Sequence, residues 1–170
     1  MKKYLFVVSV ISFITFFSCK EKEVKQTEVE KYVLSLKSNQ FENVELPVFT
    51  YKDIDDLLKY RNERDTITKF PRNPISSLYQ GDCTLGVYIL WTIESIRATA
   101  INSELLTGRF PSQNPILQLR ASEQLDIVCD EEAYQIISNA YYNWWTNRGN
   151  KSYIEIMKID PLESTNYKWH

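Results

Sequence analysis

The segment from Cys83 to Ile101 is the part of the chain that most constrains its fold. Its apolar residues lie at every angle around a helical axis instead of forming one stripe: Leu85, Val87, Tyr88, Ile89, Leu90, Trp91, Ile93 and Ile96. A helix that is apolar all round must be surrounded by protein. We therefore predict a buried central helix over this segment, capped by Asp82.

Two charged residues interrupt the apolar surface of this helix. Glu94 and Arg97 lie one turn apart on it. A buried charge is stable only when it is paired, so we predict that the two side chains form a structural ion pair in the core. A catalytic role for Glu94 is the alternative.

Three further helices are predicted from capping residues and apolar stripes. The first begins at Thr27, which forms a capping box with Glu30. The second begins at Thr50, which has Asp53 three residues later in the same arrangement. The last runs from Glu131 to Arg148, where acidic residues at the start complement the helix dipole. Residues 153–159 fit a short final helix or one strand of a small hairpin.

A short proline motif occurs twice, as residues 69–75 (KFPRNPI) and again as 109–116 (RFPSQNPI). Proline disfavours helix in the residue before it, so each copy predicts an extended corner. The spacing near 40 residues is typical of HEAT-like helical pairs, and two similar but unrelated corners are the alternative. We predict a mainly α-helical, single compact domain with proline corners.

The N-terminus has the features of an export signal. Lys2 and Lys3 precede an apolar run from Leu5 to Phe17, which Ser18 and Cys19 follow. This order is typical of a bacterial lipoprotein, in which the signal is removed and the cysteine is lipidated. A plain cleaved signal, in which Cys19 has no special role, is one alternative. A transmembrane anchor is the other, although the run is shorter than the ~20 apolar residues that a membrane-spanning helix needs.

These features divide the chain into three parts. Residues 1–18 are the predicted signal peptide, 19–26 the lipidated cysteine with a charged tether, and 27–170 the folded domain. The predicted location is the bacterial cell envelope, on the periplasmic or the cell-surface side of a membrane, with the outer membrane favoured.

Charge and composition restrict the partners. Loss of two lysines with the signal leaves 18 of the 20 basic residues against 22 acidic residues, a net charge of −4. This balance does not favour nucleic acid, which requires a basic surface. Attachment to a membrane would depend on acyl chains at Cys19.

Two cysteines remain in the predicted domain, Cys83 and Cys129. In an oxidising compartment such a pair is a candidate disulfide. Two separate buried thiols are the equally weighted alternative.

The sequence provides few groups for catalysis. His170 is the only histidine, and the four glycines are scattered, so histidine-based triads, His-rich metal sites and phosphate-binding loops are not expected. We predict no catalytic residues, no metal and no cofactor. A glycosidase that uses only carboxylates stays open, because two acids across a cleft are sufficient.

Aromatic residues on the last long helix are the best candidate binding site. The predicted core face of this helix comprises Ala133, Ile136, Ile137, Ala140 and Trp144. Helical spacing places Tyr134, Tyr142 and Trp145 together on a flank beside that face. Tyr and Trp anchor protein interfaces, so we predict a non-enzymatic module that docks a protein partner. Glycan binding or processing is one alternative, and burial of the three residues beneath the C-terminal tail is another.

Three segments of the chain resemble a known family. They are YVLSLKSNQFENVELPVFTYKDIDDLLKY, FPRNPISS and LGVYILWTIESIR. The chain is similar, over Val29 to Arg97 and beyond, to an uncharacterised family of Bacteroidetes lipoproteins catalogued as a domain of unknown function. The resemblance implies an envelope location and one compact domain, and it assigns no functional residue.

Overall fold

The central helix of the fold is α3 (Leu85–Ala100), which is buried over nearly its whole length. The computed structural model describes residues 25–76, 81–112 and 114–170. The predicted central position of this helix is confirmed, but its start is not. Cys83 and Thr84 form a strand, and Thr84 in place of Asp82 occupies the N-cap position.

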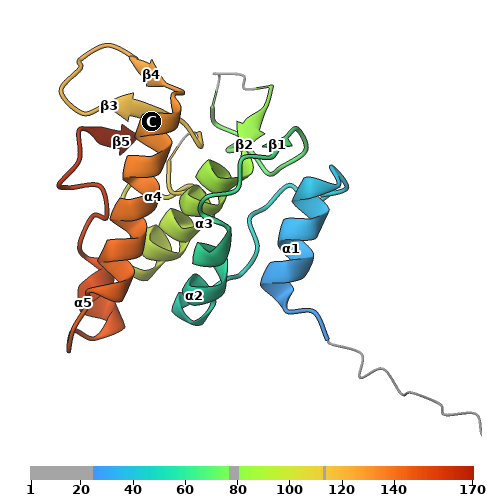
Figure 1. Cartoon of the computed structure of the whole chain (residues 1–170), viewed down its shortest axis with the longest axis horizontal. Helices are drawn as coiled ribbons and strands as arrows, with labels where there is room; N and C mark the ends of the chain where they lie inside the picture. The colour runs from blue at the N-terminus through green and yellow to red at the C-terminus, as the bar shows by residue number, and fades with distance from the viewer. Residues whose placement is uncertain (1–24, 77–80, 113) are drawn as a thin grey trace, which may run out of the picture.

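The other helices surround α3. Within the described residues they are α1 (Glu28–Lys37), α2 (Ile54–Leu57), α4 (Glu131–Thr146) and α5 (Tyr153–Met157), with short 3₁₀ segments η1 (Tyr51–Asp53) and η2 (Leu58–Tyr60). The central helix contacts α2, η2, α4 and α5. Figure 1 shows α4 along one side of α3 and α1 on the other side.

Local sequence determines where these helices begin. In α1, the Glu30 backbone N–H donates to Thr27 Oγ1 at 3.1 Å, and the Thr27 backbone N–H donates to the Glu30 carboxylate at 2.8 Å. Thr50 and Asp53 form the second predicted capping box. Asp130 caps α4 by accepting from the backbone N–H of Ala133 at 2.7 Å. Because these caps satisfy free N–H groups, they fix the starts of the helices.

Two small antiparallel sheets complete the fold. The first pairs β1 (Thr66–Ile67) with β2 (Cys83–Thr84). The second has the order β4-β3-β5, from β3 (Leu117–Leu119), β4 (Ile127–Val128) and β5 (Tyr167–Trp169). In this sheet the central strand aligns Leu117 with Val128 on one side and with Trp169 on the other.

The prediction of a mainly α-helical domain is wrong. Two small sheets form, and both α2 and α5 are single short turns. The strands contain two or three residues each, which is too short to show the alternation that reveals a strand in sequence. Residues 153–157 form a helix, and the tail after them supplies β5, which pairs with β3 and not within a local hairpin.

The two proline corners pack against each other on α3. The Asn73 side-chain amide donates to the Ser112 carbonyl at 3.0 Å, and the Asn114 amide donates to Ser76 Oγ at 2.7 Å. Trp91 Nε1 of α3 donates to Ser112 Oγ at 2.7 Å. The repeated motif thus forms one paired structure over the central helix. It does not separate stacked helical pairs, so the HEAT-like arrangement is wrong as well.

Candidate functional site

Glu94 and Arg97 lie in a buried polar network. Arg97 Nε donates to the two Glu94 carboxylate oxygens at 2.9 and 2.8 Å, and the Tyr141 hydroxyl donates to Glu94 Oε2 at 2.9 Å. Trp169 Nε1 donates to the Tyr141 oxygen at 2.8 Å. Arg97 also donates to the Met157 carbonyl. The network therefore joins α3 to α4, α5 and β5.

The environment of Glu94 is that of a structural group. The residue is only 6% exposed, and this burial raises the pKa of its carboxyl, against the lowering effects of Arg97 and Tyr141. Burial likewise raises the pKa of Tyr141 well above its ordinary value. Since the carboxylate is enclosed and bonded to two side chains, the geometry leaves no face open to a substrate.

The three aromatic residues predicted to bind a partner do not form one platform. Trp145 is 3% exposed, and its Nε1 donates to Asp55 Oδ1 at 2.7 Å. Tyr142 is 42% exposed. Tyr134 is partly buried and eight residues from Tyr142, which corresponds to about 12 Å along the helix. Only Tyr142 of the three offers a large exposed surface.

The buried face of α4 is rotated relative to the prediction. It comprises Ala133, Ile137, Ser138, Tyr141, Trp144 and Trp145. Ile136, predicted to be in the core, is 37% exposed. Tyr141 and Trp144 turn inward because their polar atoms find partners inside the fold: Trp144 Nε1 donates to the Ile156 carbonyl at 3.0 Å. Hydrophobicity alone does not reveal such partners.

A different region gathers aromatic and arginine side chains from η1, the end of η2, α4 and α5; two of its tyrosines are exposed, its tryptophan is buried, and the others are partly buried. We call it the aromatic–arginine seam and define it by six residues: Tyr51, Arg61, Tyr142, Trp145, Arg148 and Tyr153. The Arg61 guanidinium lies 4.3 Å from the Tyr142 ring centre, and that of Arg148 lies 4.3 Å from the Trp145 ring. The rings of Tyr51 and Tyr153 stack with centroids 3.9 Å apart and planes 6° apart.

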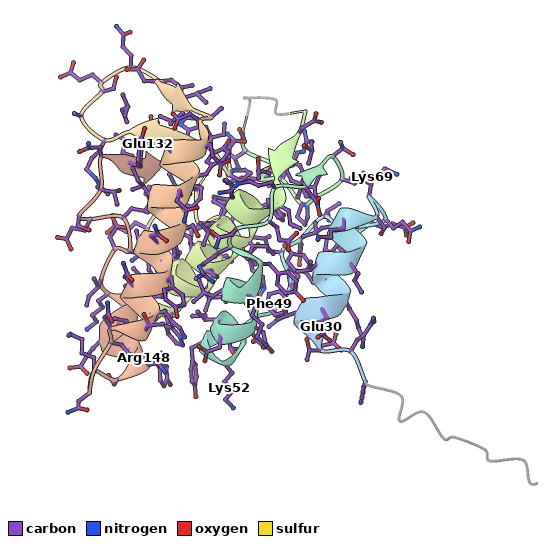
Figure 2. All side chains as sticks on the ribbon, viewed as in Figure 1. Glu30, Phe49, Lys52, Lys69, Glu132 and Arg148 are labelled. Atoms are coloured by element: carbon purple, nitrogen blue, oxygen red, sulfur yellow. The ribbon has the colours of Figure 1, made fainter. Side chains whose placement is uncertain are left out.

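The Arg148 part of the seam lies at one end of the molecule. Figure 2 shows Arg148 at the same end of the molecule as Lys52, while Glu132 lies at the opposite end of α4. The hydrogen bond from Trp145 to Asp55 joins α4 to α2, and the stack of Tyr51 on Tyr153 joins η1 to α5.

The two arginines of the seam form no ion pair among the described residues. Arg61 Nη1 donates to the Leu58 carbonyl, and Arg148 Nη1 donates to the Trp145 carbonyl, both at 2.8 Å. Arg61 Nε is buried and has no hydrogen-bond partner in the described part of the chain. The nearby Asp55 carboxylate already accepts from Trp145. The seam thus contains two arginines that form no ion pair with any described carboxylate.

A wider groove lies beside α1. It has a volume of about 950 Å³, and Phe41, Phe49 and the exposed Val44 line it. Of the four carboxylates that line it, Glu28 serves an ion pair and Asp53 a helix cap, and the other two are Glu42 and Glu45. The groove lacks tryptophan and arginine anchors, so the seam is the better candidate for recognition.

Cys83 and Cys129 are free thiols in the structure, so the candidate disulfide is not formed there. Cys83 is buried and Cys129 is exposed. Both line one cavity of about 260 Å³ together with Tyr134.

Within the described ranges, no group of three or more His, Cys, Asp or Glu side chains could hold a metal ion. Over the same residues, no helix has both the length and the apolar character needed to cross a bilayer. Cys19 and the predicted signal peptide lie outside the described residues.

Comparison with known proteins identifies a family. Residues 23–170 match the model of a family described as "Domain of unknown function (DUF4943)". The chain belongs to this family. The resemblance to a family of unknown function is therefore confirmed, and it covers the whole described domain of this DUF4943 chain. No curated protein and no solved structure matches it.

Four of the six seam residues were missed by sequence reasoning: Tyr51, Arg61, Arg148 and Tyr153. Their contacts connect η1 and η2 to α4 and α5, and no local pattern records which helices meet. An arginine three residues after a tryptophan, as in Trp145 at the end of α4 and Arg148 just beyond it, is the one signal that could have indicated stacking.

Proposed function

We propose that this DUF4943 chain is a non-enzymatic binding module, anchored in the cell envelope, that docks a protein partner on the aromatic–arginine seam. The observation that carries the proposal is the pair of arginines, Arg61 and Arg148, which stack on aromatic rings and have no carboxylate partner among the described residues.

The chemistry of the seam suits an acidic segment of a partner protein. Arginine forms two parallel hydrogen bonds with a carboxylate, and it keeps this ability while stacked on a ring. Tryptophan, tyrosine and arginine are the residues that contribute most to binding at protein interfaces. A segment that brings carboxylates to Arg61 and Arg148 and apolar side chains to Tyr142 and Tyr153 would complement this surface.

The anchor is the second part of the proposal. Lipidation at Cys19 would hold the domain to a membrane through a short charged tether that ends where α1 begins. Several acyl chains on one cysteine give firm attachment, whereas one chain alone is marginal. Such a tether would leave the domain free to meet partners in the periplasm or at the cell surface.

Cross-linking in native envelopes tests the proposal. Lipidated full-length protein is compared with Arg61→Met/Arg148→Met and with a matched control, Val44→Ala, whose exposed side chain lies in the groove beside α1. We expect a specific protein that the wild type and the control retain and the double variant loses. The purified partner should then bind at least tenfold more weakly to the double variant, and more weakly to wild type in high salt.

Two outcomes would contradict the proposal. A partner retained equally by all three proteins would place recognition elsewhere on the domain. Tryptophan fluorescence that responds to a glycan, with no protein captured, would favour the carbohydrate-binding alternative.

A further inference from the structure

The two thiols of the folded domain come from distant segments and meet at one cavity. Cys83 lies in β2, where its Sγ donates weakly to the Thr84 carbonyl at 3.5 Å. Cys129 directly follows β4 and is exposed. Tyr134, in the first turns of α4, lines the same cavity of about 260 Å³. Neither cysteine takes part in the seam or in the Glu94 network.

The environments of the two thiols differ strongly. Burial raises the pKa of Cys83 to about 12, against the lowering effect of the Arg72 charge, and Cys129 is close enough to act on it electrostatically. Burial also raises the pKa of the Tyr134 phenol to about 12, and both thiols act on this group. Because the thiolate is the reactive form, Cys83 reacts slowly with reagents in solution, whereas Cys129 is accessible.

We propose that Cys83 and Cys129 are an oxidisable pair, in which exposed Cys129 is the entry thiol and buried Cys83 is the resolving thiol. The oxidant is a small-molecule or protein disulfide. Joining the two sulfurs would link β2, at the start of α3, to the segment between β4 and α4.

The reaction proceeds by two thiol–disulfide exchanges. The Cys129 thiolate attacks one sulfur of the oxidant, whose S–S bond breaks, so that a mixed disulfide forms and one thiolate leaves. Cys83 then loses its proton and attacks the Cys129 sulfur, and the second thiolate of the oxidant leaves. The two protein thiols are oxidised, the oxidant is reduced to two thiols, and these take up the two protons.

Oxidation of the reduced full-length chain with glutathione disulfide tests this order. Peptide mapping by mass spectrometry under non-reducing conditions should find the peptides of Cys83 and Cys129 joined. The oxidation state of Cys19 is monitored separately, in the peptide that contains it. The melting temperature should rise on oxidation, because a cross-link restricts the unfolded chain. A wild-type protein in which Cys129 carries glutathione and Cys83 stays reduced would overturn the proposal.

Single variants separate the two roles. In Cys83→Ala, we expect glutathione to accumulate on Cys129, because the resolving thiol is absent. In folded Cys129→Ala, Cys83 should stay reduced over the same period. Glutathione on Cys83 in that variant would contradict the assigned order. Neither variant should show the rise in melting temperature on oxidation that the wild type shows.

Discussion

The Glu94 network and the aromatic–arginine seam use the same kinds of side chain in opposite ways. In the network, Arg97 is bonded to a carboxylate and a carbonyl, and Tyr141 and Trp169 complete the set. In the seam, Arg61 and Arg148 lie on aromatic rings, and their hydrogen-bond partners are backbone carbonyls.

The difference separates a structural site from the proposed recognition site. A buried charge must be satisfied within the fold, since an unpaired one is costly. An arginine at the surface stays solvated without a carboxylate, and a partner can still supply one. Removal of an arginine should therefore destabilise the fold in the first region and weaken binding in the second.

The largest effect is expected for Arg97→Met. This change leaves the Glu94 carboxylate buried without its cation, so the free energy of unfolding should fall by about 3–5 kcal/mol, as measured by urea denaturation. The control is Arg64→Met, which removes the more exposed pair with Glu131 and should cost at most about 1 kcal/mol. Equal losses in the two variants would remove the distinction between buried and exposed pairs.

Tyr141→Phe should have the next largest effect. It removes one donor to Glu94 and the acceptor of Trp169 Nε1, which should cost about 1–3 kcal/mol in the free energy of unfolding. The neighbouring exposed residue gives a matched control, because Tyr142→Phe should change stability by no more than about 0.5 kcal/mol. Thermal and urea denaturation of the two variants would measure the contrast, and the reverse ranking would refute it.

Trp145→Phe tests a residue of the seam that is itself buried. The change keeps a buried ring and removes the hydrogen bond to Asp55, so we expect a loss of about 1 kcal/mol. A double-mutant cycle with Asp55→Ala measures this bond directly, because the double variant should lose little more than either single variant. Strict additivity would mean that the bond contributes nothing to stability.

The smallest effect on stability is expected for Arg148→Met. Loss of a surface contact between a cation and a ring should cost at most about 1 kcal/mol, whereas the affinity for the partner should fall about tenfold or more. Urea denaturation and titration of the purified partner measure the two quantities. A large loss of stability with unchanged affinity would identify Arg148 as a structural residue.

The helices could be predicted where local chemistry determines them. Thr27 with Glu30 starts α1 through contacts three residues apart, and the apolar surface of residues 85–100 allows only an interior position. These signals depend on neighbours in sequence. The sequence therefore predicted the order of the helices, the central position of α3 and the pairing of Glu94 with Arg97.

The sheets and the seam could not be predicted in the same way. The strand Tyr167–Trp169 exists because Leu117–Leu119 lies beside it, and the three residues carry no recognisable pattern of their own. Tyr141 is buried because Glu94 and Trp169 meet it from other elements. Arg61 reaches Tyr142 only after α2 and α4 have packed on α3. Long-range contacts set all of these positions.

The place of Trp169 in the network has a consequence for biosynthesis. A chain that leaves a ribosome or a translocation channel from its N-terminus presents α3 long before Trp169 emerges. Until then the Tyr141 hydroxyl lacks the indole donor, and β3 lacks the strand that covers one of its edges. The domain therefore completes its interior after this segment is released, and earlier intermediates expose an open sheet edge of the kind that chaperones protect.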